Sequence, residues 1–195
     1  RVLIPGGCGF IGSSIAIYLK KNIKNCDIIT IDNLSRNTSY LNKNKLKKYN
    51  IRNIKKNLSS ENFSEIFKKK NNKIDLIIDC CAEPSVEISK KNPQLVFDSN
   101  LKSTLNLLEI AKTHNSNIIY LSTSRVYSIK KINNMFEDIS FNKKLPLIKK
   151  INENFSVESP ISFYGFTKLS SEILIKEYSY LYKIKYIINR CGVIS

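Results

Sequence analysis

Tyr164 and Lys168 stand four residues apart in "YGFTK" (164–168), a spacing that places both side chains on one face of a helix. Free tyrosine is a poor base near neutral pH because its pKa is about 10, but a nearby ammonium group favours the phenolate. Taken alone, the pair is better explained as a surface tyrosine beside a lysine that pairs with Glu172. A different, apolar face of the same stretch consists of Phe166, Leu169, Ile173 and Leu181.

The segment "YLSTSRVYSI" (120–129) places Ser122, Thr123 and Ser124 directly after an apolar run. A strand that simply ended would give way to Gly, Asn or Pro. A site that oxidises a substrate hydroxyl needs a hydroxyl donor at the carboxyl edge of its sheet. We expect Thr123 to supply it, Ser122 to serve the turn, and residues 126–127 to pack the segment onto the domain. The contacts of Arg125 stay open.

The stretch "GGCGFIG" (6–12) contains the spacing G-x-G-x-x-G. Glycines let backbone N–H groups approach a pyrophosphate, and the N-terminus of a following helix attracts it. Asp32 lies twenty residues after Gly12. It can accept hydrogen bonds from ribose hydroxyls and repel a 2′-phosphate, which favours NAD over NADP. Arg36 lies close to Asp32 in the sequence, so NADP remains an alternative cofactor; otherwise Arg36 binds the pyrophosphate. With an NAD site in the same domain, the tyrosine–lysine pair becomes a candidate proton acceptor for hydride transfer.

Apolar runs and helical periodicity predict the elements that position these residues. We expect strands at 1–4, 27–32, 51–54, 74–82, 117–122 and 185–190, and helices at 13–22, 61–69, 93–114 and 159–182. Ser159 is the predicted N-cap of the last helix and Pro160 its first residue. Continuously apolar strands that alternate with helices indicate an α/β fold, a Rossmann-type doubly wound parallel sheet covered on both faces.

Length and composition fit one globular domain of 195 residues, 42% hydrophobic,. The chain stops right after a strand, so we expect an NAD-binding domain (1–195) truncated before most of the substrate-binding lobe. No apolar run approaches the roughly 20 residues that span a bilayer. The N-terminus lacks the layout of a secretory signal. We therefore expect a cytoplasmic protein that does not bind membranes.

The formal charge of +16 raises the possibility of nucleic-acid binding,. The lysines are scattered, however, and occur together with many Asn and Ile residues, as in "NKNKLKKYN" (42–50). We interpret them as a compositional bias on solvated faces, which could also attract a polyanionic substrate, and expect no nucleic-acid partner. Five cysteines without a C-x-x-C pair predict neither a disulfide framework nor a metal site,. His114 is expected to lie at the surface.

Together these motifs resemble the extended short-chain dehydrogenase/reductase family of nucleotide-sugar epimerases and dehydratases. The resemblance covers the whole chain, and within the family it is greatest to CDP-paratose 2-epimerases. The segments that carry it are "GGCGFIG", "DNLSR" (32–36), "DLIIDCCAEPSVE" (75–87), "NLKSTLNLLE" (100–109), "LSTSRVYS" (121–128), "ENFSVESPISFYGFTKLSSE" (153–172) and "INRCGVIS" (188–195).

The resemblance implies a role for each matching residue. Thr123 corresponds to the group that hydrogen-bonds the reacting hydroxyl, Tyr164 to the acid and base, and Lys168 to the residue that binds the nicotinamide ribose. The remaining cofactor contacts fall on Gly6, Gly9, Phe10, Ile11, Gly12, Asp32, Asn33, Ser35, Arg36, Asn57, Leu58, Cys81, Ala82, Glu83 and Asn100. In this family a homodimer often forms through the two long helices, here 93–114 and 159–182.

Some positions depart from the family pattern. Pro5 replaces a usual Thr, Asp79 a frequent His, and Cys81 a frequent Ala. Asn57 stands where an acid usually receives the adenine amine. The family's dehydratases usually carry Asp-Glu after the catalytic Thr, and this chain has Ser-Arg at 124–125.

The resulting hypothesis is an NAD-dependent epimerase that inverts C2 of a CDP-dideoxyhexose, converting CDP-paratose to CDP-tyvelose through a transient keto sugar. The alternatives are a UDP-hexose 4-epimerase or other nucleotide-sugar epimerase with the same chemistry, a non-catalytic NAD-binding protein, and a nucleic-acid-binding protein.

Overall fold

The computed structural model of the chain describes residues 1–60, 63–67, 73–141 and 151–192. Its strands are β1 (Val2–Pro5), β2 (Ile28–Asp32), β3 (Arg52–Lys55), β4 (Leu76–Asp79), β5 (Asn117–Thr123) and β6 (Tyr186–Cys191). Its α-helices are α1 (Phe10–Asn22), α2 (Asn37–Lys48), α3 (Val86–Lys91), α4 (Pro93–Phe97), α5 (Ser103–His114), α6 (Ile129–Phe141) and α7 (Phe163–Tyr182). Shorter turns are η1 (Phe63–Phe67), the π-helical η3 (Asp98–Lys102) and η4 (Ser124–Val126).

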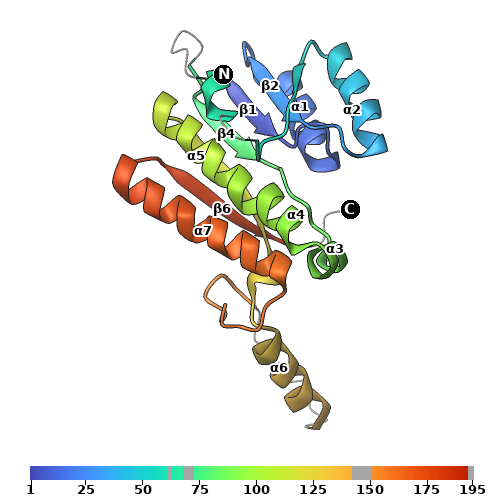
Figure 1. Ribbon diagram of the computed structural model, residues 1–195, viewed down its shortest axis with the longest axis vertical. Helices are drawn as coiled ribbons and strands as arrows, with labels where there is room; N and C mark the ends of the chain where they lie inside the picture. Colours follow the sequence, from blue (N-terminus) through green and yellow to red (C-terminus); the bar gives the residue numbers. More distant parts are fainter. Residues whose placement is uncertain (61–62, 68–72, 142–150, 193–195) are drawn as a thin grey trace.

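The described strands form one parallel sheet in the order β3-β2-β1-β4-β5-β6. The order reverses between β1 and β4, so the connections that follow these two strands lead to helices on opposite faces of the sheet. Open α/β sheets bind ligands at such a topological switch point. The predicted doubly wound parallel sheet is confirmed. Figure 1 shows α5 and α7 side by side across one face of the sheet and α6 projecting from the body.

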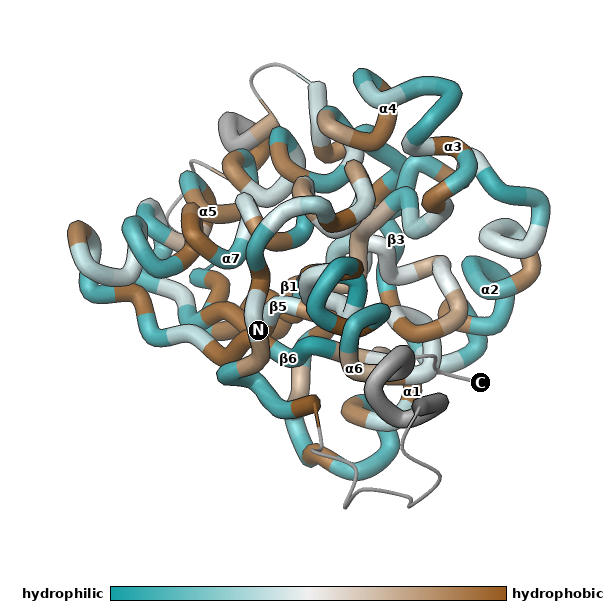
Figure 2. The backbone as a smooth tube through the Cα atoms, turned by 90° about the horizontal axis from the view of Figure 1, so that it is seen from below, coloured by the Kyte–Doolittle hydropathy of each residue, from teal (hydrophilic) through white to brown (hydrophobic). Residues whose placement is uncertain are grey.

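Two apolar cores cover the two faces of the sheet. One joins β1, β4 and β5 to α5 and α7 through residues such as Leu3, Leu107 and Ile175. The other joins β1, β2 and β4 to α1 and α2 through residues such as Ile4 and Leu46. Hydrophobic stretches gather around the central strands, whereas α2 is mostly hydrophilic (Figure 2). Within the described ranges, no helix combines the length and apolar character needed to cross a membrane.

The predicted start of the last long helix is wrong. The helix begins at Phe163, and Ser162 is its N-cap because its hydroxyl accepts the Gly165 N–H at 3.0 Å. Pro160 lies before the helix, where its carbonyl accepts the Ile129 N–H at 3.1 Å. The segment 159–161 therefore packs against the start of α6.

The prediction for His114 is also wrong. The side chain is buried, and its Nε2 lies 2.6 Å from the Phe67 carbonyl oxygen. Asn115 ends α5 in the left-handed conformation, and His114 stays on the helix face that η1 covers. The predicted helix 93–114 is present but is interrupted by the π-turn η3. Of the predicted helix 61–69, residues 63–67 form a 3₁₀ turn, and the rest lies outside the described residues.

Candidate active site

A cavity of ≈ 410 Å³ runs along the carboxyl edge of the sheet, a size typical of small-molecule sites. It is bordered by the loops that follow β1, β2, β3 and β4, by the ends of β5 and β6, and by the first turns of α7. Of the residues singled out in the sequence, it is lined by Gly6, Gly9, Phe10, Ile11, Gly12, Asp32, Asn33, Ser35, Arg36, Asn57, Leu58, Cys81, Ala82, Glu83, Thr123, Tyr164 and Lys168. Asn100 does not line it.

The glycine loop between β1 and α1 is tightly folded. Gly6 has φ +67°, and a Cβ there would lie 2.7 Å from the Cys80 carbonyl oxygen. A Cβ on Gly12 would collide with the Gly6 carbonyl oxygen, which already accepts the Gly9 N–H at 3.0 Å. The N-terminus of α1 follows at Phe10 and faces the same cavity. This cradle of backbone groups at a helix N-terminus fits a dinucleotide pyrophosphate.

Asp32 fixes the glycine loop to the end of β2. Its carboxylate accepts the Cys8 N–H at 3.0 Å and the Leu34 N–H at 2.8 Å. Leu34 adopts a positive φ of 57°, which turns the chain back over the carboxylate. Burial, followed by the charge of Asp32, raises the pKa of the Cys8 thiol to about 12, so the thiol stays protonated. Asp32 thus lies at the cavity wall where an adenosine ribose would be expected.

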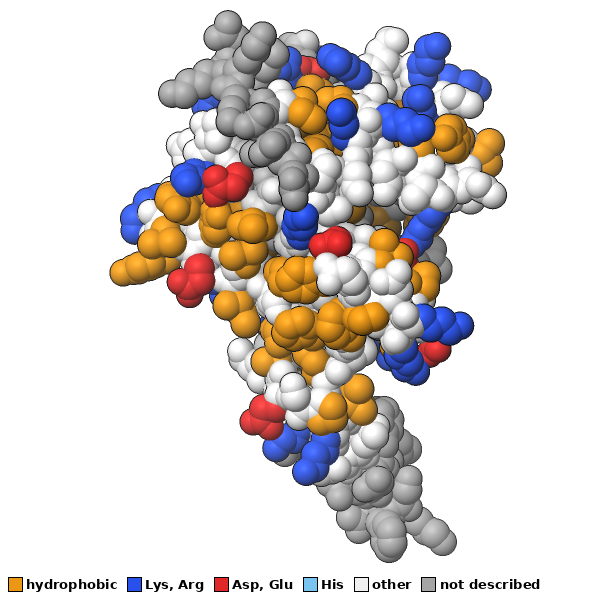
Figure 3. All heavy atoms as spheres, viewed as in Figure 1, with side chains coloured by type: hydrophobic (Ala, Val, Ile, Leu, Met, Phe, Trp, Pro, Cys, Tyr) orange, Lys and Arg blue, Asp and Glu red, His pale blue; other side chains and the backbone are white. Residues whose placement is uncertain are grey.

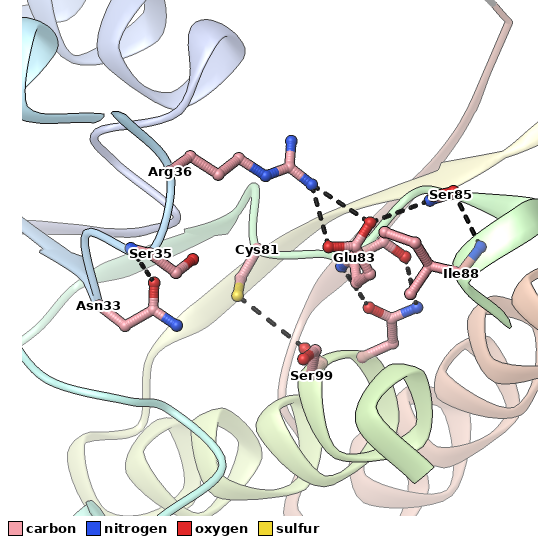
Figure 4. Close-up of polar contacts among 9 residues, drawn as sticks. Asn33, Ser35, Arg36, Cys81, Glu83, Ser85, Ile88 and Ser99 are labelled. Atoms are coloured by element: carbon pink, nitrogen blue, oxygen red, sulfur yellow. Dashed lines mark hydrogen bonds and ion pairs between the residues drawn. The ribbon is translucent and has the colours of Figure 1, made fainter. Parts of the chain in front are cut away.

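The loop after β4 forms the opposite wall, and Asn100 organises it from behind. The Asn100 Oδ1 accepts the Glu83 N–H at 2.8 Å, and its Nδ2 donates to the Glu83 carbonyl at 3.3 Å and to Thr167 Oγ1 at 3.0 Å. Asn100 is buried within the π-turn η3. Figure 4 shows Glu83 between this turn and the loop after β2, with Cys81 directed toward Ser99. The amide therefore joins the β4 loop to α7.

Thr123, Tyr164 and Lys168 also line the cavity. Thr123 is the last residue of β5, and its Oγ1 accepts the Arg125 N–H at 3.2 Å. That bond orients the hydroxyl without using its hydrogen. A side chain at Gly165 would collide with the Arg125 carbonyl oxygen, so glycine lets α7 approach the end of β5 closely. All three side chains are buried.

Lys168 is 2% exposed, and its ammonium lies 4.0 Å from the centroid of the Tyr120 ring. Burial lowers the pKa of Lys168, but Tyr120 and then Asp79 outweigh it, so the pKa is raised and the group stays charged. Asp79 pairs in register with Tyr120 on the adjacent strand. Burial raises the pKa of its carboxyl to about 6, and Lys168 opposes that rise. The lysine is thus a buried cation, stabilised by a ring and a carboxyl group.

The two faces of α7 are distinct, as the sequence predicts, and the polar one faces the sheet. Tyr164 and Lys168 lie on the buried face, whereas Phe166, Ile173 and Leu181 are exposed. Glu172 does not pair with Lys168. It forms an ion pair with Arg190 and accepts the Ser122 hydroxyl at 2.5 Å. The surface interpretation of the tyrosine–lysine pair is therefore wrong.

Other residues that line the cavity were not expected from the sequence to belong to the site: Ser39, Lys56, Cys80, Pro84, Ser99, Ser103, Leu121, Ser122, Cys191 and Gly192. Most of them are neighbours in sequence of predicted site residues at strand ends, so the predicted ends of the strands could have identified them. Tyr120 and Asp79 lie behind Lys168, and a carboxylate at the end of an apolar strand was the available signal for Asp79. Among the described residues, no group of three or more His, Cys, Asp or Glu side chains could hold a metal ion.

Comparison with known proteins agrees with this geometry. Residues 2–194 match the NAD dependent epimerase/dehydratase family. The chain is 34% identical over 195 residues to dTDP-D-glucose 4,6-dehydratase of Dictyostelium discoideum, covering 98% of this chain and 43% of that protein. It is 36% identical over 141 residues to CDP-paratose 2-epimerase of Salmonella typhi, covering 65% and 38%.

A solved structure gives the same picture. It is a mutant of UDP-glucuronic acid 4-epimerase from Bacillus cereus, in complex with UDP-4-deoxy-4-fluoro-glucuronic acid and NAD. The two structures superimpose with a TM-score of 0.76 and are 26% identical in sequence, and the match covers 97% of this chain and 55% of that one. The chain spans about half the length of the curated relatives that it matches. The family consists of enzymes, and its cofactor is NAD, for which the cleft has the required cradle and acid. This chain belongs to the NAD dependent epimerase/dehydratase family.

Proposed function

We propose that this chain forms the cofactor-binding part of an NAD-dependent nucleotide-sugar epimerase. One observation carries the proposal: Thr123, Tyr164 and Lys168 line the same cavity as the glycine loop and Asp32. A sugar held beside Thr123 and Tyr164 would therefore lie next to the expected position of the nicotinamide ring. The Bacillus cereus relative, crystallised with a nucleotide sugar and NAD, supports the pairing of these two ligands in one cleft.

Each of the three residues has a distinct task in the proposed reaction. Bound NAD supplies the hydride acceptor, and the protein handles the proton. The Thr123 hydroxyl donates to the reacting sugar oxygen. Tyr164 takes the hydroxyl proton as the C–H hydride leaves, and the sugar becomes a ketone. The buried Lys168 ammonium can bind the nicotinamide ribose.

Inversion follows when the keto sugar presents its other face. The hydride returns to the same carbon, Tyr164 gives the proton back to the oxygen, and the sugar leaves with inverted configuration. No net oxidation occurs, because the hydride and the proton both return to the substrate. Loss of water would need a further acid and base. The chain has Ser124 and Arg125 where the family's dehydratases usually carry them, which favours epimerisation.

The proposed substrate is a CDP-dideoxyhexose, inverted at C2, as in the conversion of CDP-paratose to CDP-tyvelose. The support is the likeness of "STSRVYS" (122–128), "ENFSVESPISFYGFTKLSSE" (153–172) and "NRCGV" (189–193) to that group of epimerases, together with the Salmonella typhi relative. A UDP-sugar 4-epimerase is the second candidate, favoured by the fold likeness to the Bacillus cereus enzyme. Both reactions use the same three residues and differ in the sugar pocket.

The deciding experiment incubates the full-length protein with CDP-paratose, and separately with UDP-glucose and UDP-glucuronic acid, and identifies products by NMR. Formation of CDP-tyvelose supports the first assignment. Turnover of a UDP-sugar alone replaces it with the second.

The Tyr164→Phe variant tests the role of the tyrosine. It should lower turnover by at least roughly 100-fold and still bind NADH. Tyr18→Phe, an exposed tyrosine on α1, is the matched control. If the wild type binds NADH and turns over no nucleotide sugar, the chain is a non-catalytic cofactor-binding protein.

We further propose that the full-length protein forms a homodimer through α5 and α7. Hydrophobic side chains gather over these two helices in Figure 3. The exposed apolar residues of α5 and α7 include Leu105, Phe166 and Ile173. Helices of a globular domain usually present polar residues to water. A second copy of the chain, packed with its own α5 and α7 against these, would cover the apolar residues.

A further inference from the structure

An ion pair connects the two loops that face each other across the adenosine end of the cavity. The Arg36 Nη2 lies 3.1 and 3.3 Å from the two carboxylate oxygens of Glu83. Arg36 precedes α2 in the loop after β2, and Glu83 belongs to the loop after β4. Figure 4 shows the arginine extended across the opening between the two loops. Both residues line the proposed cofactor cavity.

Glu83 is the fixed partner of this pair. Its carboxylate also accepts the Ser85 N–H at 3.2 Å, and its main chain is bound on both sides by the buried Asn100 amide. The Glu83 side chain is 17% exposed, whereas Arg36 is 55% exposed. Because the Glu83 carboxylate is already held in place, only the exposed Arg36 side chain loses conformational entropy when the ion pair forms,.

The position of Arg36 means that its ion pair with Glu83 affects which cofactor can bind. It stands four residues after Asp32, where an arginine can accommodate the 2′-phosphate of NADP. The guanidinium is bound to Glu83 instead, so a 2′-phosphate would have to break that pair and approach two carboxylates, Asp32 and Glu83. Lys56 also lines the cavity, and in the described part of the chain it forms no hydrogen bond or ion pair with Asp32 or Glu83.

We propose that Glu83 determines cofactor specificity. By holding the Arg36 guanidinium in an ion pair, Glu83 makes the cleft bind NAD in preference to NADP. The inference rests on the proposed NAD binding and goes beyond it, because Asp32 alone was the expected basis of the selection. Glu83 thus acts on the choice of cofactor through another residue. Its effect must therefore disappear when Arg36 is removed.

The test measures the Kd of NADH and NADPH by the fluorescence of the reduced cofactors, in the full-length protein freed of cofactor. The quantity compared between variants is the ratio of the Kd of NADH to the Kd of NADPH. This ratio does not change when a substitution weakens the binding of both cofactors equally. Glu83→Gln keeps an acceptor for the Ser85 N–H and releases Arg36. It should change the ratio about tenfold in favour of NADPH, the effect of one charge-assisted hydrogen bond to the phosphate.

Two further variants separate the proposal from its rivals. Arg36→Gln/Glu83→Gln should restore the wild-type ratio. Glu87→Gln removes an equal charge from α3, where Glu87 pairs with Lys90, and should leave the ratio unchanged. An unchanged ratio in Glu83→Gln, a gain that survives in the double variant, or an equal gain in Glu87→Gln would each overturn the proposal. If the wild type binds neither cofactor, the proposed function itself has failed.

Discussion

Glu172 and Arg190 form a bidentate ion pair between α7 and the end of β6. The Arg190 Nη2 lies 2.8 Å from Oε2, and its Nε lies 3.1 Å from Oε1. The glutamate side chain is 1% exposed and the arginine 13%. The pair extends to β5 through the Ser122 hydroxyl, and to residues 151–162 through the Glu153 carbonyl, which accepts from Arg190 Nη1 at 2.9 Å. The ion pair therefore connects β5, which carries Thr123, to α7, which carries Tyr164.

Glu172→Gln should lower the free energy of unfolding by about 3 kcal/mol, because it leaves a partly buried guanidinium without its counter-charge,. Urea unfolding measures the change. Glu177→Gln, an exposed acid on the same helix, should cost less than about 0.5 kcal/mol. In the double variant Glu172→Gln/Arg190→Met, part of the loss should be recovered. A loss in the double variant equal to the sum of the losses in Glu172→Gln and Arg190→Met would show that the two side chains act independently.

Asp79 gives a prediction for the dependence of stability on pH. Burial raises the pKa of its carboxyl from 3.8 to about 6. Between these values the folded protein binds the proton more tightly than the unfolded chain. The contribution of Asp79 to the free energy of unfolding is thus largest below pH 4 and is lost as the pH rises through 6. The full difference is about 3 kcal/mol.

Urea unfolding at pH 4.5 and pH 7 would measure this effect in the wild type and in Asp79→Asn. The wild type should lose stability relative to the variant when the pH is raised. Asp79→Leu should show the same pH dependence relative to the wild type even if its stability differs at every pH. Parallel curves for the wild type and both variants would contradict the raised pKa.

The sheet could be predicted from the sequence because its strands are continuously apolar, a pattern that buried parallel strands require. The helix α2 was not predicted. In Asn37–Lys48, lysine and asparagine outnumber apolar residues, and only Ser39 and Leu46 are buried. A helix with so small a buried face leaves little periodicity to detect. The start of α7 was misplaced because Ser159-Pro160 and Ser162 are all acceptable helix starts by residue type.

Part of the cavity lining could be predicted because motifs fix those residues at strand ends, where the fold brings them together. What the sequence does not show is pairing between loops. Arg36 and Glu83 are 47 residues apart, and neither residue predicts the other. The same holds for Lys168, whose neighbours Tyr120 and Asp79 come from two different strands. Such contacts depend on the order of the strands, which periodicity alone does not give.

The proposed dimer predicts a change of mass in solution. Ile173→Glu places a charge among the exposed apolar residues of α7, and burying it against a second copy would be unfavourable. Light scattering of the full-length protein should show a shift from dimer toward monomer, complete in Phe166→Glu/Ile173→Glu. Lys176→Glu also changes the charge of α7 but removes no apolar side chain, and should leave the dimer intact. A wild-type monomer, or a dimer in the double variant, would refute the proposed interface.

The glycine loop gives the most local prediction. A methyl group on Gly12 would collide with the Gly6 carbonyl oxygen, and Gly6 cannot easily move because it packs against the Cys80 backbone. Gly12→Ala should weaken NADH binding by more than roughly tenfold and destabilise the fold by about 1–3 kcal/mol. Fluorescence titration and urea unfolding measure the two effects. Gly192→Ala is the control for stability, since no described atom lies within 4 Å of the added carbon. Unchanged NADH affinity in Gly12→Ala would mean that the cofactor does not require this shape of the loop.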